Sequence, residues 1–320
     1  MLKSVKLKAL AKINLDLRVL HKRPDGFHEL RTVFQTISLA DSIQIDYQPS
    51  RRTELKLDGN VEIPGNLILR AAEAVLDAMK IHARVHFRLN KQIPMGGGLG
   101  GGSSDAAAVL MTLPALARRP APICHLAAEL GSDVPFFLEG GTAVAVGRGT
   151  ELYPLPDIAE QPILIAASGL HVSTGPAYQA LERGLTFTGS LCRINNFQEF
   201  VRALGESRRA DLASASSEND FEAVVFRQYP KLKTIRGKLS QHGAARMTGS
   251  GSAIFAIYAS EGDRERARKS LDEDRVFRNC RLWPAKLVSR RSYQRLWRRQ
   301  LAGYLDSQND LWRPRSRYGR

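Results

Sequence analysis

The sequence has few cysteines, no long apolar run and a shortage of acidic residues. Its three cysteines, Cys124, Cys192 and Cys280, lie far apart among 320 residues, so they fit neither a disulfide framework nor a CxxC metal motif. We expect each to be a buried, reduced thiol. No stretch approaches the ~18 consecutive apolar residues of a membrane span, and lysines occupy the start, where a signal peptide needs apolar residues. The sequence therefore predicts a cytoplasmic protein with no membrane segment.

The shortage of acidic residues leaves 47 Lys and Arg against 32 Asp and Glu, a formal net charge of +15. A basic surface attracts polyanions whatever their sequence. However, residues 288–320 hold nine Arg and two Asp, so nearly half of the excess charge belongs to the C-terminus. Hydrophobic residues at 43% and charged residues at 25% exclude a wholly disordered or collagen-like chain. The length suggests two domains.

Strand-like and helical patterns interleave in both halves of the chain, which indicates the α+β class. In the first half we expect a helix at 67–79, capped by Asn66, and strands at 5–20, 34–47, 85–89 and 142–146. In the second half we expect strands at 163–167, 253–258 and 280–288, with helices around Tyr178, Phe200, Leu232 and 263–271. Prolines in 151–162 suggest a boundary between domains at 1–155 and 156–295, followed by a basic tail at 296–320.

The most unusual stretch is a glycine-rich segment directly before an alanine-rich helix, which we expect to begin at Asp105. Glycine lets backbone N–H groups converge on an anion at a helix N-terminus, and this suits a polyphosphate. The segment has no lysine, so it is not a P-loop, and the residues ~20 positions later lack the acidic strand end of a dinucleotide fold. The segment consists of Pro94, Met95, Gly96, Gly97, Gly98, Leu99, Gly100, Gly101, Gly102, Ser103 and Ser104.

A phosphate loop without a lysine needs a cation and a base from elsewhere in the chain. Lys12 is a charged residue in an apolar strand, on the same face as Asn14. Asp133 is a carboxylate in a turn that leads to two phenylalanines. From the residues alone, a solvated charge is at least as good an interpretation of Lys12 and of Asp133.

Three motifs, in this order, resemble those of the GHMP kinase superfamily: ALAKINL at 9–15, the glycine-rich segment, and MTGSGSAIF at 247–255. RPDGFHEL at 23–30 and GSDVPF at 131–136 are similar, more narrowly, to those members that act on 4-diphosphocytidyl-2-C-methyl-D-erythritol. The resemblance covers the chain to about residue 295. It implies a two-domain α+β fold, with an N-terminal ribosomal-protein-S5-like domain and a C-terminal ferredoxin-like domain.

The resemblance also implies an activity, which is ATP-dependent phosphorylation of the 2-hydroxyl of that cytidyl compound in the non-mevalonate route to isopentenyl diphosphate. Asp133 matches the general base of the family, and Lys12 matches its electrostatic partner. The glycine-rich segment would wrap the phosphates of ATP, with Ser103 or Ser104 near Mg²⁺. The remaining positions that match the nucleotide site are Asn66 and Lys91.

For the substrate, the resemblance implies a histidine that recognises cytosine between two aromatic rings. His28 matches this histidine, and Phe27 and Tyr178 match the aromatic positions. Phe27 stands where family members often have tyrosine, so we expect stacking to persist without the hydrogen bond of a hydroxyl. Asn14 and Thr174 match further substrate-contacting positions.

Two alternatives stay open at this point. Another member of the superfamily, such as a homoserine or mevalonate kinase, is disfavoured by Phe27 and His28. A nucleic-acid-binding protein would use the basic tail, but we favour a terminal helix whose Leu296, Trp297 and Leu301 dock on the body. We expect a monomer or weak homodimer that acts on a small molecule, with neither nucleic acid nor a membrane as partner.

Overall fold

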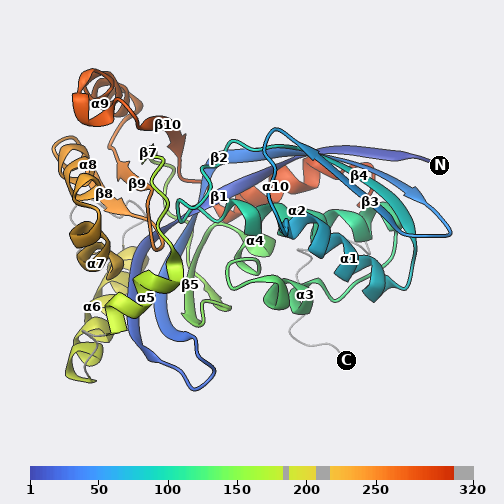
Figure 1. Ribbon diagram of the computed structural model, residues 1–320, viewed down its shortest axis with the longest axis horizontal. Helices are drawn as coiled ribbons and strands as arrows, with labels where there is room; N and C mark the ends of the chain where they lie inside the picture. Colours follow the sequence, from blue (N-terminus) through green and yellow to red (C-terminus); the bar gives the residue numbers. More distant parts are fainter. Residues whose placement is uncertain (183–186, 207–216, 306–320) are drawn as a thin grey trace.

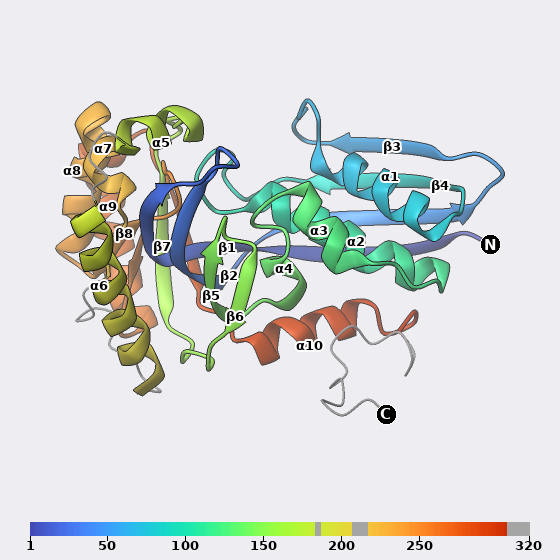
Figure 2. The ribbon, with the colours of Figure 1, turned by 90° about the horizontal axis from the view of Figure 1, so that it is seen from below.

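The computed structural model describes residues 1–182, 187–206 and 217–305. Its elements form two lobes, each built on one sheet (Figures 1 and 2). One apolar cluster fills the N-terminal lobe, another fills the C-terminal lobe, and a third joins strands of both sheets. The two lobes therefore share an apolar contact that fixes the site residues of one lobe against those of the other.

The sheet of the N-terminal lobe has the strand order β3-β4-β2-β5-β6, and β1 pairs with β2. Its strands are β1 (Lys3–Lys22), β2 (His28–Pro49), β3 (Glu54–Gly59), β4 (Ala83–Asn90), β5 (Thr142–Gly147) and β6 (Glu151–Pro154). The expected strands at 5–20, 34–47, 85–89 and 142–146 are confirmed, each longer than predicted, and β2 begins six residues before the predicted start. β3 and β6 were not expected, because both are short and largely exposed and so carry little apolar pattern.

The helices of this lobe are α1 (Leu67–Met79), α2 (Gly101–Ala117), α3 (Ile123–Leu130) and α4 (Phe136–Glu139). Asn66 caps α1 as predicted, since its side chain accepts a hydrogen bond from the Ile68 N–H at 2.9 Å. α2 begins at Gly101 and not at Asp105. A Cβ at Gly101 would stand 2.8 Å from Lys91 Nζ, so the absence of a side chain lets the first turn of α2 pack closely.

The sheet of the C-terminal lobe has the order β10-β7-β9-β8, and all of its pairs are antiparallel. Its strands are β7 (Pro162–Ala167), β8 (Ala244–Met247), β9 (Ile254–Ile257) and β10 (Arg281–Lys286). Its helices are α5 (Thr174–Glu182), α6 (Phe187–Glu206), α7 (Phe221–Gln228), α8 (Pro230–Ser240), α9 (Glu261–Glu273) and the 3-10 helix η1 (Arg275–Phe277). The strands and helices expected here are confirmed, and β8, α7 and η1 are additions. α7, α8 and α9 lie on the side of this sheet away from the other lobe (Figures 1 and 2).

The last helix, α10 (Arg290–Gln300), returns to the N-terminal lobe and runs beside β1 (Figure 2). Tyr293 and Trp297, one turn apart, are fully buried in the core of this lobe, and Leu301 follows them. The predicted docking of this helix is confirmed. α10 continues unbroken past residue 295, where the expected basic tail begins, and residues 306–320 lie outside the described residues.

The cysteine prediction is wrong in one respect. Cys124 and Cys192 are exposed, and only Cys280 is partly buried. The reason at Cys124 is that α3 turns only Leu126 and Ala127 into the core. All three cysteines are without a disulfide bond. Among the described residues, no helix is both long enough and apolar enough to cross a membrane.

Candidate active site

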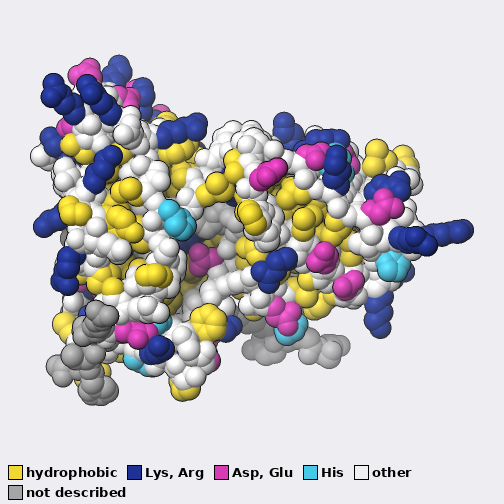
Figure 3. Space-filling view, in the orientation of Figure 1, with side chains coloured by type: hydrophobic (Ala, Val, Ile, Leu, Met, Phe, Trp, Pro, Cys, Tyr) yellow, Lys and Arg dark blue, Asp and Glu magenta, His cyan; other side chains and the backbone are white. Residues whose placement is uncertain are grey.

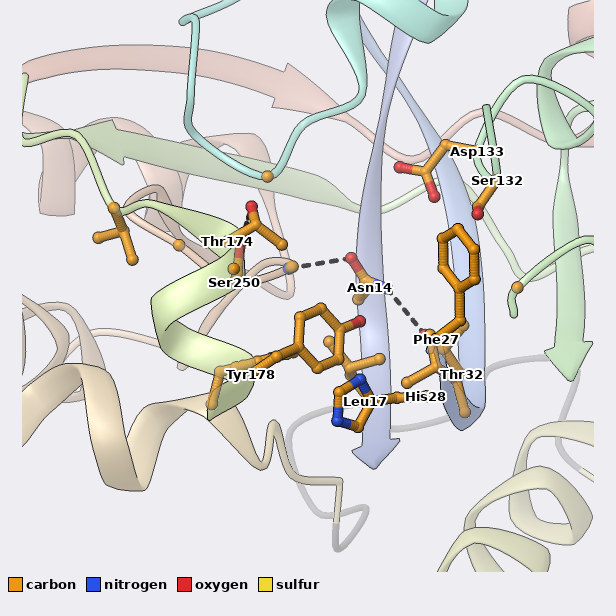
Figure 4. Close-up of a pocket in the computed structure, with 18 of the residues that line it drawn as sticks. Asn14, Leu17, Phe27, His28, Thr32, Ser132, Asp133, Thr174, Tyr178 and Ser250 are labelled. Atoms are coloured by element: carbon orange, nitrogen blue, oxygen red, sulfur yellow. Dashed lines mark hydrogen bonds between the residues drawn. The ribbon is translucent and has the colours of Figure 1, made fainter. Parts of the chain in front are cut away.

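A cavity of about 820 Å³ is lined by residues of both lobes. The N-terminal lobe contributes β1, the β1–β2 turn and part of the glycine loop (residues 94–104), and the C-terminal lobe contributes α5 and the turn at 249–251. The surface is hollowed between the lobes (Figure 3), and Figure 4 shows the side chains that face the cavity. The predicted site residues in its lining are Lys12, Asn14, Phe27, His28, Gly96, Gly98, Asp133, Thr174 and Tyr178.

Lys12 and Asp133 form an ion pair at one end of the cavity. Lys12 is buried, and its Nζ lies 3.4 Å from Asp133 Oδ2. The Lys12 backbone N–H donates to the Leu99 carbonyl oxygen at 3.0 Å, which ties this part of β1 to the glycine loop. The Asp133 side chain is one-third exposed and extends into the cavity from the turn before α4 (Figure 4). A carboxylate beside an ammonium group at this distance can accept a proton while the cation offsets the developing charge.

Asn14 connects this ion pair to the C-terminal lobe. Its Oδ1 accepts hydrogen bonds from Lys12 Nζ at 2.8 Å and from the Gly249 N–H at 3.0 Å. Its Nδ2 donates to Thr32 Oγ1 at 2.8 Å, and its backbone N–H donates to Thr248 Oγ1 at 3.0 Å. We call this part of the cavity, which comprises Lys12, Asn14, Asp133 and the glycine loop, the transfer end.

The glycine loop needs its glycines where it turns and where it packs. Gly98 has φ 72°, and a Cβ there would stand 2.2 Å from the Thr248 carbonyl oxygen. Gly100 has φ 70°, and its Cβ would stand 2.8 Å from the Phe137 ring. Side chains at these two positions would therefore push the loop away from Thr248 of the C-terminal lobe and from Phe137 of the N-terminal lobe. The loop delivers the chain to the N-terminus of α2, where free N–H groups favour an anion.

Several predicted nucleotide residues lie behind the loop, outside the lining of the cavity. Lys91 Nζ is buried between Asp41 Oδ2 at 2.5 Å and Asp105 Oδ2 at 2.7 Å. Burial raises the pKa of Asp105 to about 7, against the opposing effect of Lys91. Ser104 is also buried, and its Oγ donates a hydrogen bond to the Leu10 carbonyl oxygen at 2.7 Å. These side chains brace the loop and the first turns of α2 from below.

The opposite part of the cavity, which we call the base end, is formed by aromatic rings. His28 stacks on Tyr178 with ring centroids 4.5 Å apart and planes 22° apart, and Tyr178 meets the edge of Phe221. Phe27 is half exposed, and the Arg148 guanidinium lies 4.7 Å from the centroid of its ring. Burial, together with the charge of Asp133, raises the pKa of the Tyr178 hydroxyl, so it stays neutral.

Sequence reasoning missed several residues of the cavity. Ser250 belongs to the motif at 247–255 but was not among the predicted site residues, and its Oγ lies 3.0 Å from Thr174 Oγ1. Arg148, His171 and Glu182 also line the cavity but stand in no motif. They reach it only through the way the lobes fold together.

Comparisons with known proteins agree with this architecture. Residues 66–141 match the family model of the GHMP kinases N terminal domain, and residues 190–275 match that of GHMP kinases C terminal. The chain is 49% identical to 4-diphosphocytidyl-2-C-methyl-D-erythritol kinase of Solibacter usitatus, over 98% of this chain and 97% of that protein. The chain belongs to the 4-diphosphocytidyl-2-C-methyl-D-erythritol kinase family.

Other members of this kinase family are similar over most of their length. The protein of that name from Pseudothermotoga lettingae is 39% identical, over 80% of this chain and 92% of its own. A crystal structure of 4-(cytidine 5'-diphospho)-2C-methyl-D-erythritol kinase has a TM-score of 0.71 at 35% identity, with 88% of this chain and 98% of that chain covered. A homoserine kinase from Cytophaga hutchinsonii has the same TM-score at 16% identity, over 89% and 97% of the chains, and shows the fold alone. The predicted two-domain GHMP kinase fold is confirmed.

Proposed function

We propose that this protein transfers a phosphoryl group from ATP to the 2-hydroxyl of 4-diphosphocytidyl-2-C-methyl-D-erythritol. The products are the 2-phosphate and ADP, in the methylerythritol phosphate route to isopentenyl diphosphate. Family membership supports the reaction. The observation that carries the proposal is the Lys12–Asp133 pair, 3.4 Å apart, which faces a cavity bounded by the glycine loop and by the rings of the base end.

In this proposal Asp133 is the general base and Lys12 is its electrostatic partner. Asp133 accepts the proton of the 2-hydroxyl as the hydroxyl oxygen attacks the terminal phosphorus of ATP. Lys12 stabilises the negative charge that develops on the transferred group. Its hydrogen bond to Asn14 Oδ1 aims the ammonium group into the cavity. The backbone bonds of Asn14 and Lys12 to both lobes hold the pair in place.

For the nucleotide, we propose that N–H groups of the glycine loop and of the first turn of α2 bind the ATP phosphates. Asn66 and Lys91 border this site, and Lys91 acts from behind the loop through Asp105. When bound, Mg²⁺ would supply positive charge that offsets the charge of the ATP phosphates. It usually keeps phosphate and water ligands and needs only one or two protein groups. Among the described residues, no group of three or more His, Cys, Asp or Glu side chains could hold a metal ion.

The serines of the loop differ in their availability to such an ion. The Ser104 hydroxyl is already donated to Leu10, so we propose that Ser103, which lies on the first turn of α2, is the loop hydroxyl near Mg²⁺.

For the cytidyl substrate, we propose that His28 recognises the base, with Phe27 and Tyr178 as stacking surfaces. A base in the plane of the His28 ring, as a hydrogen bond to the ring requires, would lie parallel to Tyr178, because the two planes differ by only 22°. Asn14 and Thr174 border the path from the base to Asp133. These groups would place the acceptor hydroxyl at the transfer end.

A substrate panel tests the proposed function. Purified protein is incubated with ATP, Mg²⁺ and one acceptor at a time: the cytidyl compound, mevalonate or homoserine. ADP release is expected only when the cytidyl compound is the acceptor, because mevalonate and homoserine carry no base for His28 to recognise. Turnover of mevalonate or homoserine without turnover of the cytidyl compound would contradict the proposal.

Two further expectations accompany the proposal. We propose a domain boundary near residue 155, at the end of β6, with α10 as part of the N-terminal lobe into whose core it packs. That the enzyme acts as a monomer or a weak homodimer stays a prediction.

A further inference from the structure

The partner of His28 on α5 has no role in the reaction described above. His28 Nε2 lies 2.9 Å from Glu182 Oε1, and the His28 side chain is buried. His28 Nε2 is buried and makes no well-aligned hydrogen bond in the structure, and the Glu182 carboxylate is the acceptor that lies beside it. The same Glu182 oxygen lies 3.1 Å from Lys22 Nζ on β1, and Glu182 lines the cavity at its base end.

Glu182 is placed to influence which ring nitrogen of His28 carries the proton. Hydrogen bonding to Lys22 lowers the pKa of Glu182, and His28 adds to this effect, so the side chain is an anion at neutral pH. An ionised carboxylate only accepts hydrogen bonds. The proton of a neutral His28 is therefore favoured on Nε2, which leaves Nδ1 with a lone pair, because the bond made at one ring nitrogen sets the state of the other.

The acceptor nitrogen faces the cavity. In Figure 4 the ring nitrogen beside the Cβ attachment points toward the space between Tyr178 and Asn14, and the other nitrogen points away from it. An acceptor there matches the exocyclic amino group of cytosine. It does not match uracil, which has a carbonyl oxygen at the same place, and two acceptors facing each other leave both without a partner.

We propose that Glu182 is a specificity-determining positioning residue, which fixes the tautomer of His28 so that the site accepts cytosine and rejects uracil. This inference rests on the proposed placement of the base at His28. Glu182 touches no reacting atom and acts only through the ring of His28.

The test compares the binding of CDP and UDP at pH 8, where an imidazole is largely neutral. Dissociation constants are measured by calorimetry for the wild-type protein and for Glu182→Met. A matched control is Gln179→Met, because Gln179 lies on the same helix and lines the same cavity. Glu182 differs in that its carboxylate oxygen lies next to His28 Nε2. The wild type should prefer CDP by about tenfold or more, the expected effect of one unmatched polar pair.

Glu182→Met should lose most of this preference, and Gln179→Met should keep it. A CDP preference that survives in Glu182→Met, that is lost equally in both variants, or that is absent from the wild type would overturn the inference. Nitrogen-15 spectra of the histidine rings give a readout that a merely structural role would not move. His28 should show an unprotonated Nδ1 in the wild type and a mixture of tautomers in Glu182→Met, and a protonated Nδ1 in the wild type would also overturn it.

Because nucleotide binding is measured without turnover, this experiment is independent of the proposed reaction. A protein that separates CDP from UDP through Glu182 but does not phosphorylate the cytidyl compound would refute the proposed function and leave this inference standing.

Discussion

The transfer end and the base end of the cavity are built in different ways. At the transfer end, Lys12 and Asn14 are buried, and hydrogen bonds tie them to backbone of both lobes. At the base end, Phe27 stands half exposed on a turn, and Glu182 is held by a lysine at the surface. Groups that perform chemistry must be held within ~0.5 Å of their productive positions, whereas a stacking surface tolerates small shifts.

This difference separates the two kinds of effect that substitutions should have. A change at the transfer end removes interactions made only in the transition state and should lower kcat. A change at the base end removes interactions made equally in the bound substrate and should raise KM.

The largest effect is expected at Asp133. Asp133→Asn keeps the shape of the side chain but removes the proton acceptor, so kcat should fall about 10²- to 10⁴-fold, with little change in KM for ATP. Steady-state kinetics measure both constants. Asp58→Asn on β3 is the control, since this exposed carboxylate pairs with Lys56 and His86. Turnover of Asp133→Asn within a few-fold of the wild type would mean that another group is the base.

The next effect is expected at Lys12. Lys12→Met keeps the apolar stem and removes the cation, so kcat should fall about 10²- to 10³-fold, the usual cost of one preorganised electrostatic contact. Lys8→Met is the matched control, because Lys8 lies on the same strand but is exposed. If both variants lose activity to the same degree, general damage to β1 and not the cation at the transfer end is responsible.

Asp105 provides a test of the buried support below the glycine loop. Its pKa of about 7 in the folded protein lies above the 3.8 of an ordinary aspartate. Between these values the folded protein keeps a proton that the unfolded chain releases, so this group lowers the free energy of unfolding as the pH rises through the window. The free energy of unfolding of Asp105→Asn, relative to that of the wild type, should therefore increase as the pH rises from 4 to 7.

Urea denaturation at several pH values measures this trend. Asp58→Asn serves as the control. Hydrogen bonds to His86 and Lys56 lower the pKa of Asp58, so its effect on the pH dependence of the free energy of unfolding has the opposite sign. If the difference in free energy of unfolding between Asp105→Asn and the wild type does not change with pH, Asp105 is not a buried, partly protonated carboxyl.

The smallest effect is expected at Phe27. Phe27→Tyr keeps the stacking surface and adds a hydroxyl, which at a half-exposed position should contribute no more than about 1 kcal/mol. KM for the cytidyl substrate should fall by less than about fivefold, with kcat and KM for ATP unchanged. A large change in kcat would show that the two ends of the cavity are not separable in the way described.

Local patterns predicted the parts of the fold that local interactions determine. The helix α1 and its Asn66 cap follow from a polar cap before an apolar stripe. Short motifs predicted Lys12 and Asp133 as site residues, and the structure places their charged groups 3.4 Å apart. The start of α2 was placed four residues late, since glycine disfavours helices, and the sequence does not show the close approach of Lys91 Nζ that excludes a side chain at Gly101. β8, with four residues, was too short to show a pattern.

Contacts between distant segments explain what the sequence did not reveal about the site. Glu182 has no motif of its own and becomes a partner of His28 only when α5 docks beside the β1–β2 turn. Lys91 was predicted at the nucleotide, but its charge is enclosed by Asp41 and Asp105, which come from β2 and α2. No local spacing joins these three residues.

The most direct test of the account is the position of the phosphate in the product. Wild-type protein is incubated with ATP, Mg²⁺ and the cytidyl compound, and the product is examined by phosphorus-31 NMR. Carbon 2 of 2-C-methyl-D-erythritol bears a methyl group and no hydrogen, so we expect ADP together with a phosphomonoester signal that shows no three-bond coupling to a proton. A proton-coupled phosphomonoester, or ADP release without any new ester, would contradict it.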